Sequence, residues 1–116
     1  MLFRSKIYVR FFDIDWNEYQ KSANPVASLQ VSKVATQNTL EIVPTIFITN
    51  QTFQQIADKD IPDLATKVWA KIQEINKELN SKKIKEIQLD CDWTSNTKGK
   101  FFEFCKVLKQ QIEPAI

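Results

Sequence analysis

Two segments that lie far apart in the chain share a pattern of acidic and aromatic residues. Residues 12–16 (FDIDW) and residues 89–93 (LDCDW) each place an apolar residue before Asp-x-Asp-Trp. Two neighbouring carboxylates can divide acid and base roles in a hydrolysis, or accept hydrogen bonds from hydroxyl groups. Because side chains alternate along a strand, the aspartates of each pair are expected to point to the same side. The candidate catalytic residues are therefore Asp13, Asp15, Asp90 and Asp92.

The composition excludes several kinds of catalysis. The chain has no histidine, which removes the commonest general base and metal ligand. A serine–histidine or cysteine–histidine pair therefore cannot be built from this chain. Its two cysteines, Cys91 and Cys105, are too few for an all-thiolate zinc site. We predict no cofactor and no metal site, and we expect both cysteines to be free thiols.

Net charge and hydropathy limit the kinds of partner that the chain is expected to bind. With 16 basic and 14 acidic residues, the net charge of +2 gives no electrostatic basis for binding nucleic acid. No run of about 20 apolar residues exists, so no membrane span is predicted. Residues 1–6 lack the apolar run of a signal peptide, and the compartment is left open. The 116 residues suffice for a single domain.

Three strands are predicted from β-branched and aromatic runs, at residues 7–12, 40–49 and 84–93. Residues 17–25 read as a loop, and residues 26–34 as an extended excursion. Pro44 is awkward inside the second strand, so its paired part is expected to begin at Thr45 or the proline to sit at a bulge.

The third predicted strand alternates strictly between apolar and polar residues. One face carries Ile87, Leu89, Cys91 and Trp93, and the other carries Glu86, Gln88, Asp90 and Asp92. A strand with one apolar and one polar face fits a barrel whose interior holds a polar site.

Helices are predicted to follow the second and third strands. After a short helical turn at residues 52–58, a long helix begins at Asp60 as its N-cap, and a second begins near Asn96-Thr97 and stops at Pro114. The buried stripe of the first is Ile61, Leu64, Ala65, Val68, Ile72, Ile75 and Leu79. That of the second is Phe101, Phe104, Cys105, Leu108 and Ile112. This alternation predicts an α/β fold of parallel βα units, arranged as a partial (β/α) barrel.

In such folds ligands bind at the carboxyl ends of the strands, where both aspartate pairs would lie. Arg10 inside a strand needs a partner, and a buried ion pair with Glu86 or Asp90 is expected. Structural roles stay open as well: the aspartates could cap the next helix or bind loop amides, and the tryptophans could pack in the core or at its rim. The candidate binding residues are Arg10, Trp16, Asn50, Gln88 and Trp93.

Residues 90–93 (DCDW) resemble the fourth-strand motif D-x-D-W-E of chitinase-type glycosidase barrels. In that family the aspartates support a glutamate that protonates the leaving group, and Thr94 occupies the glutamate position here. Together, residues 8–16, 42–50 and 86–94 resemble the front part of an uncharacterised bacterial family. Its members look like glycoside-hydrolase barrels and are often exported or lipid-anchored. The resemblance implies that residues 1–116 are the N-terminal part of a barrel of about 250 residues.

Three functional hypotheses follow. The leading one is a portion of a glycoside hydrolase-like barrel that binds or acts on carbohydrate, and that could be inactive as this fragment. The second is a non-catalytic α/β module that self-associates through unpaired sheet edges, as a dimer or higher oligomer. The third is a divalent cation held by the aspartates.

Overall fold

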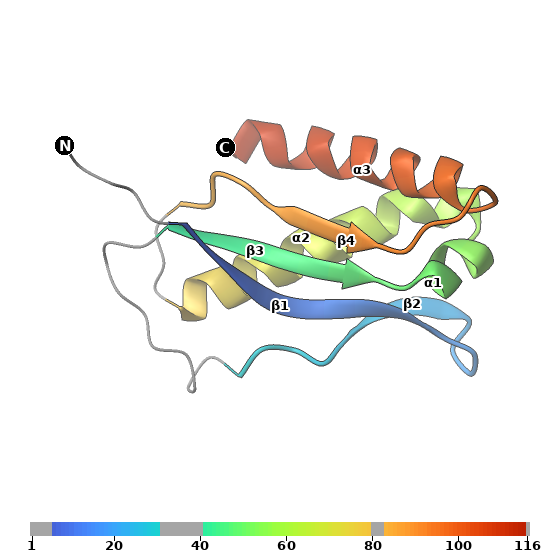
Figure 1. Ribbon diagram of the computed structural model, residues 1–116, viewed down its shortest axis with the longest axis horizontal. Coiled ribbons are helices and arrows are strands. Elements are labelled where there is room, and N and C mark those ends of the chain that lie inside the picture. The colour runs from blue at the N-terminus through green and yellow to red at the C-terminus, as the bar shows by residue number, and fades with distance from the viewer. Residues whose placement is uncertain (1–5, 31–40, 80–82, 116) are drawn as a thin grey trace.

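The computed structural model describes residues 6–30, 41–79 and 83–115, which form two layers (Figure 1). One layer is an open four-stranded sheet in the order β2-β1-β3-β4, and the helices of the other layer cover one of its faces. The strands are β1 (Lys6–Asn17), β2 (Ser22–Val26), β3 (Glu41–Ile48) and β4 (Gln88–Cys91). The helices are α1 (Asn50–Gln55), α2 (Ile61–Glu78) and α3 (Lys98–Ile112), with 3₁₀ turns at Asp58–Asp60 and Glu113–Ala115.

The predicted α/β class is confirmed, but the arrangement is not barrel-like. β1, β3 and β4 are parallel, as expected, whereas β2 runs antiparallel to β1 at one edge of the sheet. The sheet of the described residues is open, with β2 and β4 at its two edges. The barrel-like arrangement predicted from the polar face of residues 84–93 is therefore not what these strands form. That polar face belongs to an open sheet instead.

The hairpin between β1 and β2 corrects the prediction of a loop over residues 17–25. β1 continues to Asn17, and residues 13–17 pair with residues 22–26. The side chain of Asn17 accepts hydrogen bonds from the amides of Tyr19 and Gln20, which turns the chain. Lys67 of α2 then ties β2 to the helix layer through the carbonyl of Ala23, at 3.0 Å.

A bulge in β1 decides which of its side chains enter the core. Arg10 pairs with Thr45 of β3 and Phe12 pairs with Ile46, so Phe11 is an extra residue in β1. Phe11 and its neighbour Phe12 are both fully buried. Simple alternation from the start of the strand would place the aspartates of β1 on the core side, and the extra residue returns them to the opposite face.

Pro44 lies within β3, paired in register with Val9. β4 pairs with residues 45–48 of β3, so among the described strands β3 has one neighbour at Pro44 and two beyond it. A proline lacks the amide that a second neighbour would need, which explains its tolerance at this position. The paired part thus begins before Thr45, and the register shift lies in β1 rather than at the proline.

The predicted helical stripes form the core. All seven predicted residues of the α2 stripe are buried, and α3 buries Phe101, Phe104 and Leu108 while Cys105 and Ile112 are half-buried. α2 does begin just after Asp60, although the side chain of Asp60 makes no capping hydrogen bond. β4 is shorter than the predicted strand 84–93, since the segment before Gln88 approaches the sheet without pairing.

Candidate ligand-binding face

The face of the sheet opposite α2 and α3 carries two rows of side chains, which we call the open face. The first row crosses the parallel strands as Arg10, Thr45 and Gln88, and the second as Asp13, Phe47 and Asp90. The register places these residues next to one another although they come from three distant segments. Four of them were predicted as site residues, and the structure brings those four together.

Arg10 binds its own strand rather than β4. Its guanidinium donates two hydrogen bonds to the carboxylate of Asp13, at 2.7 and 2.6 Å, and lies 5.4 Å from the ring centroid of Phe47. The side chain is 62% exposed, so the predicted buried ion pair with Glu86 or Asp90 is wrong. The bond to Asp13 raises the pKa of Arg10, and Asp90 adds a smaller effect of the same sign.

The other predicted partner, Glu86, pairs with a different cation. Lys6 lies 2.7 Å from Glu86, and both side chains are substantially exposed. This contact raises the pKa of Lys6. Solvent-exposed pairs of this kind contribute little to stability, so neither ion pair on the open face holds the fold together.

Asp15 makes structural contacts at the strand ends. It accepts a hydrogen bond from the hydroxyl of Thr49, at 2.8 Å, and another from the amide of Trp16. Thr49 in turn caps α1, where its hydroxyl lies 2.9 Å from that of buried Thr52. Asp15 therefore helps to fix the connection from β3 to α1, although the residue that caps α1 is Thr49 and not Asp15.

The aspartates of β4 are more available to solvent. Asp90 is exposed and accepts a hydrogen bond from Gln88 of the same strand, at 3.1 Å. Asp92 is exposed just beyond the strand end. Within the part of the chain that the structure describes, no three acidic or cysteine residues are grouped closely enough to hold a metal ion.

The two tryptophans lie away from the centre of the open face. Trp16 packs against the core and is half-buried. Trp93 is 42% exposed, and its ring meets Phe102 edge-to-face at 5.8 Å. The ammonium of Lys98 lies over both rings, 5.8 and 5.7 Å from their centroids. Trp16 thus serves packing, and Trp93 lies at the rim.

Asn50 is part of a polar link that the sequence did not reveal. Thr97 is 1% exposed, donates to the side-chain oxygen of Asn50 at 2.7 Å, and accepts from the amide of Thr94 at 2.8 Å. The link joins the first residue of α1 to the start of α3. A threonine before a helix is an ordinary N-cap, so its spacing gave no sign of this partner.

Replacing Thr97 with valine should lower the free energy of unfolding by about 0.5–1.5 kcal/mol, because the amide of Thr94 and the side-chain oxygen of Asn50 lose their partner in a part-buried link. Thr97→Ser keeps the hydroxyl and is expected to lose clearly less. Urea unfolding followed by tryptophan fluorescence measures both variants. Equal midpoints for the two variants would contradict the leading role that we assign to the hydroxyl at this position.

Both cysteines are free thiols, as predicted. Burial raises the pKa of Cys91 to about 11, with smaller contributions from Asp92 and Cys105. Burial also raises the pKa of Cys105. Both side chains pack against the core. Their raised pKa values favour the thiol over the thiolate, which is the more reactive form.

The fold and this geometry define a two-layer α/β protein with a polar, partly aromatic open face. In comparisons with known proteins, no family model, no curated protein and no solved structure matches the chain. None of the described helices has the length and apolar character needed to cross a membrane.

Proposed function

We propose that the open face binds a carbohydrate and does not hydrolyse it. The observation that carries this proposal is the arrangement of the second row, in which the register places Phe47 between Asp13 and Asp90. Arg10 and Gln88 of the first row place hydrogen-bond donors beside the same ring.

This set of groups suits a neutral polyhydroxylated ligand. Sugar hydroxyls both donate and accept hydrogen bonds, while carboxylates accept and guanidinium and amide groups donate. The C–H face of a sugar ring can pack against an aromatic ring beside these groups. Between Arg10 and Gln88, the hydroxyl of Thr45 is buried and has no hydrogen-bond partner among the described residues.

Several contacts argue against hydrolysis on this face. Glycosidases need one carboxylic acid that stays protonated and a second carboxylate across the bond. Asp13 is bound bidentately by Arg10, and Asp15 is occupied by Thr49. Asp90 and Asp92 are exposed on the surface and are not enclosed in an apolar pocket of the kind that surrounds a catalytic acid. Thr94 stands where the similar family has its acid.

Calorimetric titration with a panel of neutral and acidic oligosaccharides tests the proposal. We expect Arg10→Met to weaken binding by at least about tenfold, since hydrogen bonds from a charged group are lost. Because Arg10 is exposed, the urea midpoint of the Arg10→Met variant should stay close to that of the unmodified chain. Lys21→Met is the matched control: Lys21 also pairs with an acid three residues away, Glu18, but at the β1–β2 turn.

Lack of binding across the panel would refute the carbohydrate proposal, and so would equal binding by the two variants. Release of reducing sugar by the unmodified chain would instead contradict its non-catalytic part. The larger barrel of which residues 1–116 would be the N-terminal part stays a prediction. A longer gene product with further βα units would test it.

A further inference from the structure

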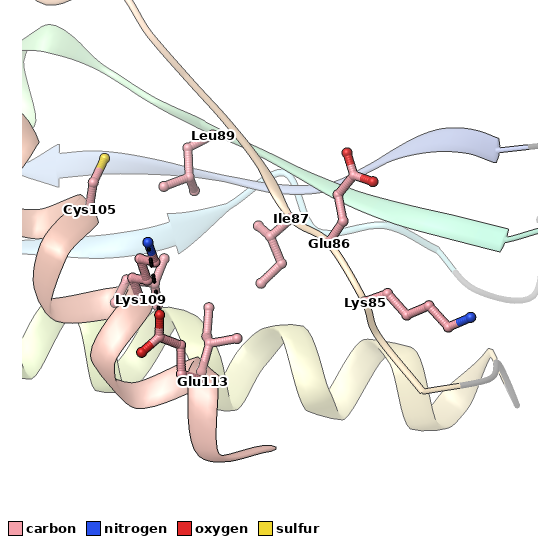
Figure 2. A pocket seen from close by; sticks show the side chains of 9 residues that line it. Lys85, Glu86, Ile87, Leu89, Cys105, Lys109 and Glu113 are labelled. Atoms are coloured by element: carbon pink, nitrogen blue, oxygen red, sulfur yellow. Dashed lines mark ion pairs between the residues drawn. The ribbon is translucent and has the colours of Figure 1, made fainter. Parts of the chain in front are cut away.

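A groove of about 510 Å³ separates β4 and the segment before it from α3 (Figure 2). Its floor and walls are apolar, and charged residues stand at its rim. The apolar lining residues are Ile87, Leu89, Cys105, Leu108 and Ile112. The rim residues are Lys85, Glu86, Lys109 and Glu113. Ile87 and Leu89 are two positions apart on one side of an extended segment, so the groove follows the repeat of a strand.

The groove adjoins an unpaired strand edge. β4 pairs with β3 on one side, and no strand of the described residues pairs with its other side. Such an edge presents main-chain donors and acceptors in a row. When an extended segment joins a sheet edge, the main chain supplies affinity and pockets for alternate side chains supply specificity. β4 offers both, because the apolar groove lies on the helix side of the edge.

The charged residues beside this edge indicate which side chains an added strand would carry on the open face. On the open face, the residues along β4 and its extensions are Glu86, Gln88, Asp90 and Asp92, which carry three carboxylates. Lys6 forms an ion pair with Glu86, and Asp90 accepts a hydrogen bond from the side-chain amide of Gln88. A strand placed beside them is favoured if its residues on that face are basic.

We propose that β4 and the groove form a docking site for an extended peptide segment with alternating apolar and basic residues. Its apolar residues fill the groove under α3, and its basic residues face the carboxylates of β4. A partner protein supplies the segment as a fifth strand. β4 of a second copy does not fit, because α3 is the outermost element on the β4 side, and a two-fold pairing would bring two α3 helices together (Figure 1).

The chain itself contains a suitable probe. Residues 6–12 (KIYVRFF) already form a strand of this sheet and alternate apolar residues with Lys6, Tyr8 and Arg10. A fluorescein-labelled peptide of this sequence, titrated with the protein, is expected to show a saturable rise in anisotropy. A second peptide with glutamate at both basic positions should bind about tenfold more weakly, through repulsion by the carboxylates of β4.

Protein variants locate the site. Ile112→Glu puts a charge in the groove and should weaken binding by at least about tenfold. Val26→Glu, at the opposite edge of the sheet where Val26 is 44% exposed, should bind unchanged. If circular dichroism shows that Ile112→Glu is unfolded, the comparison of the two peptides on the unmodified protein still tests the proposal. No saturable binding, or equal binding of both peptides, would overturn the proposal. If light scattering shows that the unmodified chain is a dimer and that Ile112→Glu is a monomer, the groove binds a second copy of the chain and the proposal of a partner protein is wrong.

Discussion

Deleting Ile14 from β1 is expected to leave the chain unfolded, whereas deleting Phe11 from the same strand should leave its pairing with β3 intact. Without Ile14, Asp15 takes the place opposite Ile48 and turns into the core. A one-residue slip moves all following side chains to the wrong face. Burying an unpaired carboxylate costs several kcal/mol, which is comparable to the whole stability of a small domain.

Deleting Phe11 removes the bulge residue instead. Arg10 and Phe12 then become neighbours opposite Thr45 and Ile46, where they already lie, so each later residue keeps its face. The expected cost is that of one lost core phenylalanine, about 3–5 kcal/mol. Circular dichroism and urea unfolding of the two deletions provide the comparison. A folded Ile14 deletion, or a Phe11 deletion that is equally unfolded, would contradict the assignment of the bulge to Phe11.

Phe53→Ala is expected to lower the free energy of unfolding by about 3–5 kcal/mol, which is the usual cost of truncating a buried phenylalanine. Phe53 is 1% exposed, and its ring lies 5.8 Å from that of Phe101 and 5.7 Å from that of Phe104. It is the buried aromatic residue by which α1 joins α3, so the cavity left by truncation lies between two helices and a sheet.

Phe102→Ala is the matched control for this truncation. Phe102 also makes aromatic contacts on α3, with Trp93 and Phe101, but it is 48% exposed. Its truncation should cost about 1 kcal/mol or less, because surface changes away from the core have small effects. Similar urea midpoints for Phe53→Ala and Phe102→Ala would show that the cluster around Phe53 is loosely packed.

Regular periodicity explains what the sequence could predict. The apolar residues of α2 are spaced three or four positions apart, which is typical of a helix with one buried face. Each residue of the predicted stripe is buried. The alternation around β4 likewise placed Gln88 and Asp90 on the same face. These patterns depend on local geometry alone, so no knowledge of neighbouring strands was needed.

Features that depend on partners elsewhere in the chain escaped prediction. β2 contains asparagine and proline, which are rare in strands, and it forms because the Asn17 turn returns the chain along β1. Alternation alone predicts Glu86 or Asp90 as the ion-pair partner of Arg10. It cannot show that the strand of Arg10 has a bulge, which brings Asp13 within reach. The open sheet itself follows from strand pairing, about which one strand's polar face says nothing.

The order of strands in the sheet also bears on how the chain acquires its structure. The β1–β2 hairpin joins residues close in sequence, and hairpins of this kind form within microseconds. The parallel pairs β1–β3 and β3–β4 instead join segments separated by long stretches of chain, so loop entropy is lost before their contacts form. We therefore expect the hairpin to form first, β3 to be added to it, and β4 with α3 to complete the sheet last. In that order of events the aromatic residues that meet around Phe53 would stay exposed until α3 packs, so we expect the partly folded chain to be the form most prone to aggregation.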